Sequence, residues 1–528
     1  LFAGPAGQIA DRFSKTRVLQ VTKALEIVTM GLGLTALLLN RIELLLAVLF
    51  LLATQANFFS PAKYGILPEM MGEAELTSAN GLVEFSTLAA IVLGTSFGVF
   101  LIGLWKNDPW KMGGTLLAIA VVGSLTSLRI PRVAASGSSE PFHWNPFHEV
   151  WIGARRLREN RALCLTVFGI AYFWFIGALF QMAILLMGKE TLHASEARIG
   201  YLAMTLAVGI GAGSIAAGWF SRQHIELGLV PFGSFFLGLF SAVLSVTHSY
   251  PWAICWLVAI GFFGGLYFVP LNAFLQERAG NHEKGRLLAT NNFVNTAGML
   301  LSSGVLWLLH DRLHWPARYI LGLLGVGTLV ATLYVIHILR ANSLRFLLLG
   351  LTRACFRIRV IGAEKIPAKG GALLVSNHVS YVDAVVIGSC THRFVRFLMW
   401  KPYFDLKLLR PFLKLLQAIP IHVSPKQTVR ALREACAELK RGELVCIFPE
   451  GSITRTGHIH AFQRGIERII ECSPETPIIP LSVLGLAGHP LSANGSRSLS
   501  NWIRNWRPEV IISLGDPMYS PASCAEIR

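Results

Sequence analysis

The sequence predicts an α-helical membrane bundle followed by an α/β domain, and three observations support this prediction. Hydrophobic residues make up 53% of the 528 residues and charged residues only 15%, against about 25% charged in a typical soluble chain. Long charge-free runs fill the chain up to residue 340, whereas short β-type runs alternate with helical patterns after residue 345. The mean hydropathy of +0.53 excludes a disordered, a collagen-like and a wholly soluble chain.

The charge-free runs locate the membrane-spanning helices, because a helix needs about 20 apolar residues to cross a bilayer. The run between residues 226 and 277 is long enough for two helices that turn near residues 248–251, and another span starts near Val18. The remaining runs lie between Glu43 and Lys63, Glu84 and Lys106, Lys111 and Arg129, Arg161 and Lys189, Arg198 and Arg222, Arg286 and Asp311, and Arg318 and Arg340. The prediction is ten spans, the last of which ends near Arg340.

Lys and Arg are concentrated in one set of loops, which the positive-inside rule assigns to the cytoplasm. These residues are Arg12, Lys15, Arg17, Lys63, Arg132, Arg155, Arg156, Arg158, Arg161, Arg222, Arg278, Lys284, Arg286, Arg340 and Arg345. Everything after residue 340 is therefore predicted to be cytoplasmic. The formal charge of +17 is explained by these loops and by anionic lipid, and not by a nucleic acid, because it is spread along the chain.

An internal repeat divides the bundle into two related halves. Residues 59–61 and 80–83 (Phe-Ser-Pro, then Asn-Gly-Leu-Val) are echoed by residues 268–270 and 291–294, about 210 residues later. Gly7-Gln8-Ile9-Ala10 is likewise echoed by residues 213–216. The repeat predicts a twelve-span parent protein of which this chain lacks the first two spans. Such a bundle would have an open central cavity, so we expect it not to transport by itself.

The loop from Gly7 to Arg17 (Gly-Gln-Ile-Ala-Asp-Arg-Phe-Ser-Lys-Thr-Arg) resembles the loop between spans two and three of the major facilitator superfamily. In that family its charged residues form a relay that holds the two helix bundles together at the cytoplasmic face. The resemblance implies a gating motif of Gly7, Asp11, Arg12, Lys15 and Arg17. Taken alone, the same residues also fit a solvated basic loop. Residues 59–69 further resemble a segment of bacterial lysophospholipid transporters.

Two carboxylates inside the predicted spans are candidates for the transport path. Glu26 and Glu84 would be costly in the bilayer unless they faced the interior of the bundle. The alternative is that both lie near span ends, where they pair or reach the interface. Two basic amphipathic stretches, residues 150–161 and 344–359, are expected to lie on the cytoplasmic leaflet.

The first candidate for catalysis follows a buried strand at residues 372–376. His378 and Asp383 are five residues apart with a turn between them, so the carboxylate can hold Nδ1 of the imidazole. That contact would fix the tautomer and leave Nε2 free as a general base. A His-x4-Asp pair is common by chance, and an Asp that caps a helix explains many examples. The pair alone therefore does not predict a catalytic site, and a second motif is needed to support it.

The second motif follows another apolar strand, at residues 444–448. Pro449-Glu450-Gly451-Ser452 combines a glycine that permits close backbone approach with a carboxylate that could bind a hydroxyl or orient Arg455 toward a phosphate. A third apolar run covers residues 478–483. The ordered set of Asn-His-x4-Asp, Phe-Pro-Glu-Gly and Ile-Pro-Leu resembles the glycerolipid acyltransferase family over about residues 350–528.

This resemblance implies transfer of an acyl group from a thioester to a glycerol hydroxyl. His378 would be the general base and Asp383 would orient it. The implied substrate-binding residues are Glu450, Gly451, Ser452, Arg455 and Lys401. No cofactor or metal is required, and acyl-CoA or acyl-[acyl carrier protein] would be the donor substrate. A Ser hydrolase is disfavoured because there is no G-x-S-x-G elbow, and Cys446 within its apolar strand is predicted to be a core residue.

Two departures from the family pattern bear on the acceptor. Many members carry an Arg shortly after an Ile-Pro pair, whereas here Ile419-Pro420 is followed by His422. The Arg that usually follows Phe-Pro-Glu-Gly-Thr is displaced to Arg455. Both features are more similar to the phospholipid-recycling acyltransferases that take lysophosphatidylethanolamine than to those that take lysophosphatidic acid.

The prediction is therefore a transporter domain over residues 1–343 and an acyltransferase domain over residues 344–528. We expect a multi-pass protein of the bacterial inner membrane that transports lysophospholipid and reacylates it on the cytoplasmic side, with acyl carrier protein as a candidate partner. One alternative is a lysophosphatidic acid acyltransferase of de novo synthesis tethered to a transporter bundle. Another is a solute or drug exporter with a regulatory domain. The eight cysteines include no CxxC pair, which predicts neither a disulfide framework nor a zinc site.

Overall fold

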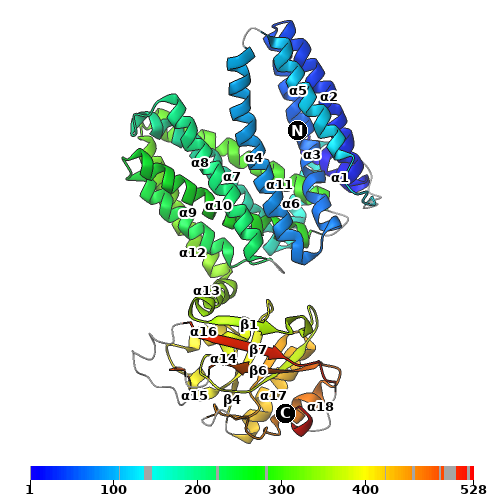
Figure 1. Cartoon of the computed structure of the whole chain (residues 1–528), viewed down its shortest axis with the longest axis vertical. Coiled ribbons are helices and arrows are strands. Elements are labelled where there is room, and N and C mark those ends of the chain that lie inside the picture. Colours follow the sequence, from blue (N-terminus) through cyan, green and yellow to red (C-terminus); the bar gives the residue numbers. More distant parts are fainter. Residues whose placement is uncertain are drawn as a thin grey trace. The chain divides into compact units, whose positions relative to one another are not determined.

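The chain divides into two compact units, residues 1–338 and residues 339–528 (Figure 1). The computed structural model describes residues 2–105, 108–135, 145–221, 225–279, 284–422, 424–454, 458–486, 489–490, 492, 507–519 and 524–527. The division lies five residues before the boundary expected from the sequence. Each unit is described below by itself.

The described part of the first unit consists of helices and the loops that join them. Its elements are α1 (Ala3–Arg12), α2 (Lys15–Leu38), α3 (Ile42–Met70), α4 (Glu73–Trp105), α5 (Pro109–Ser127), α6 (Pro146–Glu159), α7 (Arg161–Glu190), α8 (Glu196–Phe220), α9 (Leu229–Ser245), α10 (Tyr250–Arg278), α11 (Lys284–Leu306), the π-helical turn η1 (Trp307–Arg312) and α12 (Ala317–Ile338). Every apolar run singled out in the sequence coincides with a helix. Within the described residues, seven helices are long and apolar enough to cross a membrane: α2, α3, α7, α8, α10, α11 with η1, and α12.

The other three predicted spans are the helices α4, α5 and α9. Helix α9 is apolar but has only 17 residues, and α5 carries Lys111 in its first turn. The sequence therefore placed these helices correctly, while length and composition mark seven rather than ten as spans within the described part of the chain.

Helices of the two repeat halves pack most closely where glycines remove side chains. Helix α4 lies against α8, and α1 lies against α11. A Cβ on Gly81 would approach the Ser214 carbonyl oxygen to 2.4 Å, and one on Gly7 would approach the Gly285 carbonyl oxygen to 2.7 Å. Both positions therefore require glycine. Figure 1 shows α2, α3 and α5 grouped on one side of this unit, and α7 to α10 with α12 grouped on the other.

The second unit is built on a seven-stranded sheet of order β1-β7-β6-β2-β5-β3-β4. The strands are β1 (Arg357–Ile361), β2 (Ala372–Ser376), β3 (Val395–Trp400), β4 (Ile419–Ile421), β5 (Leu444–Ile447), β6 (Ile478–Leu484) and β7 (Glu509–Leu514). Strands β6, β2, β5, β3 and β4 are parallel to one another, and β1 and β7 run the opposite way. The helices are α13 (Arg340–Cys355), α14 (Asp383–Gly388), α15 (Lys401–Phe404), α16 (Arg410–Leu415), α17 (Pro425–Lys440), α18 (Gly465–Cys472) and α20 (Cys524–Ile527), with a 3-10 turn η2 (Ala363–Lys365).

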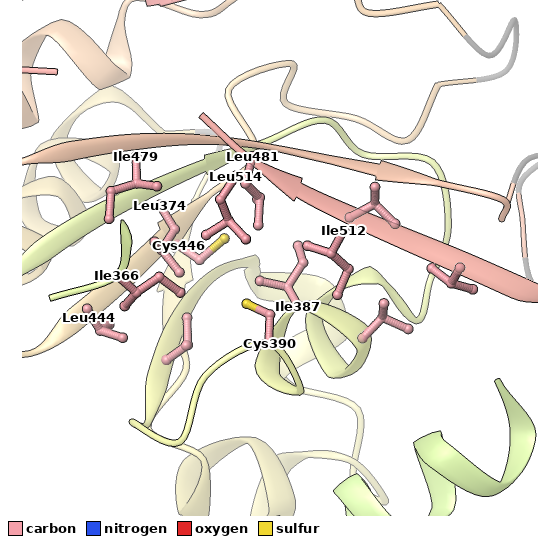
Figure 2. Packing of buried hydrophobic residues seen from close by; sticks show 14 of the residues in the cluster. Ile366, Leu374, Ile387, Cys390, Leu444, Cys446, Ile479, Leu481, Ile512 and Leu514 are labelled. Carbon is pink, nitrogen blue, oxygen red and sulfur yellow. The ribbon is translucent and has the colours of Figure 1, made fainter. Parts of the chain in front are cut away.

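Both faces of this sheet are buried, as continuous apolar strands predict for a parallel sheet. Leu374 of β2 and Cys446 of β5 point into one core, which is covered by Ile387 of α14 (Figure 2). Alternate residues such as Leu373 and Val445 point into the opposite core, which α17 and α18 cover. The sheet is therefore a rigid central layer, and the segments at the carboxyl ends of its parallel strands are held in place by it.

One expectation about the cysteines was wrong. Cys436 of α17 and Cys472 of α18 form a disulfide with their Cα atoms 6.3 Å apart. The two residues are separated by 36 positions in the sequence, so a short-range motif such as CxxC could not predict the disulfide. They meet because α17 and α18 pack on the same face of the sheet. A group of residues able to hold a metal ion is absent from the described part of the chain.

Candidate functional site

The His378–Asp383 pair lies at the carboxyl end of the central strand β2. Nδ1 of His378 is 2.8 Å from Oδ2 of Asp383, which is fully buried. The same carboxylate oxygen accepts the backbone N–H groups of Val379 at 2.7 Å and Ser380 at 2.9 Å. Asp383 therefore closes the turn and holds the imidazole at once. With Nδ1 as the donor, the lone pair of Nε2 is free, and the His378 side chain remains 22% exposed.

Aromatic stacking covers one face of the His378 ring. The Phe448 ring stacks on it with 4.1 Å between ring centroids and 18° between planes. Phe448 follows β5, the neighbour of β2, and it also stacks on Phe397 of β3. Residues on or directly after three adjacent strands thus cover one face of the imidazole, which limits the directions in which Nε2 can point.

Glu450 contacts the same segment through the main chain. Its side chain is buried, with Oε1 accepting the His378 backbone N–H at 2.9 Å and Oε2 accepting the His460 backbone N–H at 2.9 Å. The Thr454 N–H donates to the His378 carbonyl oxygen at 2.8 Å. The sequence had suggested that this carboxylate binds a hydroxyl or orients Arg455. In the structure both of its oxygens instead join the His378 turn to the segment after β5.

Three of the four other predicted substrate residues lie in the described part of the chain. Gly451 has a φ of +74°, a left-handed conformation that favours glycine, and Ser452 is exposed. Lys401 lies at the start of α15, and its Nζ is 2.7 Å from Oδ2 of Asp405. This hydrogen bond lowers the pKa of Asp405 below its ordinary range. Arg455 lies outside the described residues.

Sequence reasoning gave no role to three residues that build this site. The Asn377 amide donates to the Val483 carbonyl at 3.1 Å and accepts the Val483 N–H at 2.8 Å, which ties the end of β2 to β6. Phe448 stacks on His378, and His460 supplies the second amide to Glu450. Asn377 and Phe448 lie inside the quoted motifs, so the motifs themselves were the signal. His460 is ten residues from Glu450 and has no such signal.

Buried thiols close to this turn are unsuited to nucleophilic catalysis. Burial raises the pKa of Cys390 to about 12. The pKa of Cys446 also lies well above its ordinary value, because the thiol is buried and faces Cys390 and Asp383. Both thiols therefore stay protonated near neutral pH. Figure 2 shows the two side chains within the core, as expected for Cys446 from its place in an apolar strand.

In the first unit, part of the predicted gating motif joins the two repeat halves. Asp11 is buried, and its carboxylate accepts the backbone N–H groups of Gly285 at 2.6 Å and Arg286 at 2.9 Å, at the start of α11. Lys15 is fully buried, with Nζ 2.5 Å from Oε1 of Glu69 at the end of α3. Gly7, Asp11 and Lys15 are thus brought into this contact region. Arg12 and Arg17 are exposed.

Further contacts between the halves follow the internal repeat. Asn80 of α4 and Gln276 of α10 exchange two hydrogen bonds of 2.9 Å and 2.8 Å. Asn292 of α11, from the echoed segment, donates to the Ser60 hydroxyl of α3 at 3.1 Å. The repeat relates the helix pairs but not the individual residues: α4 bonds to α10 in one contact, and the corresponding helices α11 and α3 bond to each other in the second. The halves are closed together at this end of the bundle.

Both carboxylates considered for the transport path have partners. Oε2 of Glu26 is 2.6 Å from Nζ of Lys23, one turn earlier in α2. Glu84 is buried, and the Tyr64 hydroxyl donates to its Oε2 at 3.3 Å. Glu26 therefore fits the alternative interpretation, in which the carboxylate is paired with a neighbouring side chain and has no role in transport. Glu84 is the carboxylate that lies buried inside the bundle.

Comparisons with known proteins agree with both halves of this arrangement. Residues 1–303 match the Major Facilitator Superfamily model, and residues 357–484 match the Acyltransferase model. The chain therefore belongs to the major facilitator superfamily, with an acyltransferase domain fused after its bundle, and it is a multi-pass membrane protein. The sequence-based identification of this fusion, with its helical bundle and α/β domain, is confirmed.

Similar proteins of known function or structure indicate which kind of transporter the bundle resembles. The lysophospholipid transporter LplT of Klebsiella pneumoniae is 32% identical over 312 residues, which are 58% of this chain and 75% of that protein. The LplT of Yersinia pestis is 32% identical over 308 residues, or 57% of this chain and 72% of that protein. The solved fucose:proton symporter FucP of E. coli shares the fold of the bundle, with a TM-score of 0.51 and 14% identity over 63% of this chain and 87% of that one. Homology to LplT and the fused domain together support a role in transport combined with acyl transfer.

Proposed function

We propose that this protein recycles lysophospholipid: the bundle moves it across the bacterial inner membrane, and the second unit reacylates it at the cytoplasmic face. The acyl acceptor is the free glycerol hydroxyl of lysophosphatidylethanolamine, and the donor is an acyl thioester. The 2.8 Å contact between His378 Nδ1 and Asp383 Oδ2 is the observation that carries the enzymatic half. Homology to lysophospholipid transporters supports the transport half.

The reaction needs one group that moves a proton. Nε2 of His378 takes the proton of the glycerol hydroxyl while the hydroxyl oxygen bonds to the thioester carbonyl carbon. The carbonyl re-forms as the C–S bond breaks, and the thiol leaves with the proton that His378 returns. Asp383 keeps the ring in the tautomer that can accept this proton and stabilises the imidazolium. Glu450 acts through the main chain of His378 and is therefore a positioning residue.

The choice of acceptor rests on the residue that follows β4. A phosphomonoester headgroup carries more negative charge than a phosphodiester and favours a bidentate Arg. After β4 the chain offers His422 where many glycerolipid acyltransferases carry an Arg. This difference favours an acceptor whose phosphate already carries ethanolamine. The concentration of Lys and Arg in one set of loops supports the cytoplasmic assignment of the second unit.

Acyl transfer by membranes that contain the full chain tests the proposal, beside a His378→Ala control. Labelled acyl-CoA and acyl-[acyl carrier protein] are each offered with lysophosphatidylethanolamine and, separately, with lysophosphatidic acid. We expect His378-dependent product from the ethanolamine lipid. Product from lysophosphatidic acid alone would instead assign the enzyme to de novo synthesis. No product with any lysolipid would overturn the enzymatic half and favour an exporter with a regulatory domain.

A further inference from the structure

The first unit contains a cavity that lies apart from the contacts between the two halves. Its volume is about 720 Å³. Three segments form its wall: residues 190–193 after α7, His248 before α10, and residues of the stretch 310–318, which leads from η1 into α12. Helix α11 begins at the Asp11–Gly285 contact, and this stretch follows its far end, so the cavity lies at the opposite end of the bundle. We call it the histidine cavity.

Both signs of charge and several imidazoles line the histidine cavity. Arg318 supplies a positive charge, and Glu190 and Asp311 supply negative charges. Four of the 15 histidines of the chain complete the polar wall: His193, His248, His310 and His314. A ligand that carries an anionic and a cationic group can pair with both sets of side chains, whereas a simple anion or cation would leave one set unused.

Histidines and carboxylates are also the side chains that bind many metal ions. Within the described residues, however, no group of three His, Cys, Asp or Glu side chains is placed to hold such an ion. A zwitterionic ligand is therefore the better match for this wall.

Glu190 links the segments that form the wall. Its Oε2 accepts the Ala317 backbone N–H at 3.1 Å, at the start of α12. Its Oε1 is 3.5 Å from Nε2 of His310, and Nδ1 of the same ring is 3.1 Å from the Trp315 carbonyl oxygen. The end of α7, the turn η1 and the start of α12 are therefore held together by the chain itself, so the cavity is formed before a ligand binds.

Other polar side chains of the wall have no such partner. Asp311, His193 and His314 form no side-chain hydrogen bond or ion pair within the part of the chain that the structure describes. All three are exposed, so they can bind a ligand from solution. His193 and His314 also adopt φ values of +45° and +51°. This left-handed conformation is uncommon for residues other than glycine and is frequent at ligand sites.

Trp315 and Arg318 suit the two ends of a zwitterionic ligand. Trp315 is 39% exposed, and the face of an indole ring attracts an ammonium group. The Arg318 guanidinium lies over the Tyr319 ring, 4.8 Å from its centroid, and Nη2 donates to the Tyr319 hydroxyl at 3.1 Å. These contacts orient the guanidinium plane and leave further N–H donors that can bind a phosphate.

We propose that the histidine cavity binds a phosphoethanolamine headgroup, with the phosphate against Arg318 and the histidines and the ammonium group against Asp311 and Trp315. The three segments of the wall contain none of the Lys and Arg residues of the loops assigned to the cytoplasm, so the positive-inside rule assigns the cavity to the outer face. There it captures the lysolipid before transport. The role in capture rests on the proposed function, whereas headgroup binding does not.

Titration calorimetry of the full chain in maltoside micelles tests headgroup binding. The probe is glycerophosphoethanolamine, which is water-soluble and carries the complete headgroup. Glycerophosphoglycerol lacks the ammonium group, and ethanolamine lacks the phosphate. We expect the first probe to bind about tenfold more tightly than the other two, because it alone pairs with both sets of charges. Equal affinity for all three, or no binding of the first, would overturn the proposal.

Two substitutions locate the bound headgroup. Arg318→Gln should weaken the binding of both phosphodiesters about tenfold, whereas Asp311→Asn should weaken the binding of glycerophosphoethanolamine and not that of glycerophosphoglycerol. The matched control is Arg312→Gln, because this guanidinium also lies over an aromatic ring, that of Trp307, but does not line the cavity. It should leave every affinity unchanged. Equal effects of the three substitutions, or no effect of any, would contradict binding in this cavity.

Lysophosphatidylethanolamine in the same micelles distinguishes a lipid ligand from a free phosphodiester. We expect it to bind with an affinity that also falls about tenfold in Arg318→Gln. If Arg318→Gln weakens only the binding of glycerophosphoethanolamine, the cavity serves soluble phosphodiesters and the role in lysolipid capture is wrong. Displacement of glycerophosphoethanolamine by Zn²⁺ would assign the wall to a metal ion and would likewise overturn the proposal.

Failure of this site and failure of the proposed function give different results. If Arg318-dependent binding is present but membranes with the full chain neither move nor acylate lysophosphatidylethanolamine, the proposed function fails and the headgroup site stands. If acyl transfer depends on His378 while no probe binds in a manner that depends on Arg318, the enzymatic function stands and the headgroup site fails.

Discussion

Glu450 holds His378 by its main chain and not by its ring: Oε1 of the carboxylate accepts the His378 N–H at 2.9 Å, and Oε2 accepts the N–H of His460 at 2.9 Å. A carboxylate whose two oxygens each accept one N–H sets the position of the imidazole, and its remaining lone pairs can still accept a substrate hydroxyl. The two roles predict different kinetics, and a substitution can separate them.

Glu450→Gln keeps the shape of the side chain but replaces one acceptor by an NH₂ group, which cannot accept an N–H. We expect kcat to fall about 10- to 100-fold with little change in KM, because the turn that carries His378 loses one charge-assisted hydrogen bond worth about 1.5–3 kcal/mol. Steady-state kinetics against the lysolipid acceptor measure this split. Glu471→Gln, at an exposed position of α18, is the control. A rise in KM at unchanged kcat would show that Glu450 binds the acceptor.

Asp383→Asn tests how the imidazole is oriented. The amide oxygen can still accept the N–H groups of Val379 and Ser380, but it carries no charge to stabilise an imidazolium and can present its NH₂ group to Nδ1. We expect acyl transfer to fall by about 10²- to 10⁴-fold, as for other carboxylates that orient a catalytic histidine. Circular dichroism should show a folded domain. Activity near that of the unaltered chain would mean that Asp383 serves only to close the turn.

The two buried thiols give a prediction about pH. Burial raises the pKa of Cys390 to about 12 and that of Cys446 well above its ordinary value, so both remain protonated at about pH 8 to 9, and only thiolates react rapidly. Iodoacetamide should leave both unmodified in the folded protein over this range, while the partly exposed Cys355 should be labelled. Peptide mapping by mass spectrometry measures each site. Rapid labelling of Cys446 in the folded chain would contradict its place in the core.

How far the sequence predicts this molecule depends on the distance over which each contact is formed. His378 and Asp383 are five residues apart and meet within one turn, so residue spacing alone was enough to propose the contact. Asn377 and Val483 are 106 positions apart, and they meet only because β2 and β6 are neighbours in the sheet. The roles of Glu450 and His460 depend on the path of the segment between them, which no periodicity describes. The same is true of Cys436 and Cys472.

In the membrane-spanning unit, too, the sequence predicts local elements but not the contacts between distant residues. Charge-free runs gave the helices, since each helix is a local element, and the motif from Gly7 to Arg17 indicated where the halves meet. It did not indicate that Asp11 accepts backbone N–H groups of Gly285 and Arg286 while Arg12 remains exposed. Backbone donors carry no signature in the sequence. The expected pairing among side chains is present between Lys15 and Glu69, whereas Asp11 binds the start of a helix.

Asp11→Asn tests whether this contact holds the two halves together. The substitution keeps one oxygen acceptor but removes the charge that favours the amino-terminal end of α11, so we expect the closed end to open more often. Hydrogen exchange at the Gly285 and Arg286 amides should accelerate about tenfold, which corresponds to about 1.4 kcal/mol of lost stabilisation. Asp108→Asn, at a partly exposed pair with Lys111, should leave these amides unchanged. Unaltered exchange in Asp11→Asn would show that glycine packing between α1 and α11, and not the carboxylate, holds this end closed.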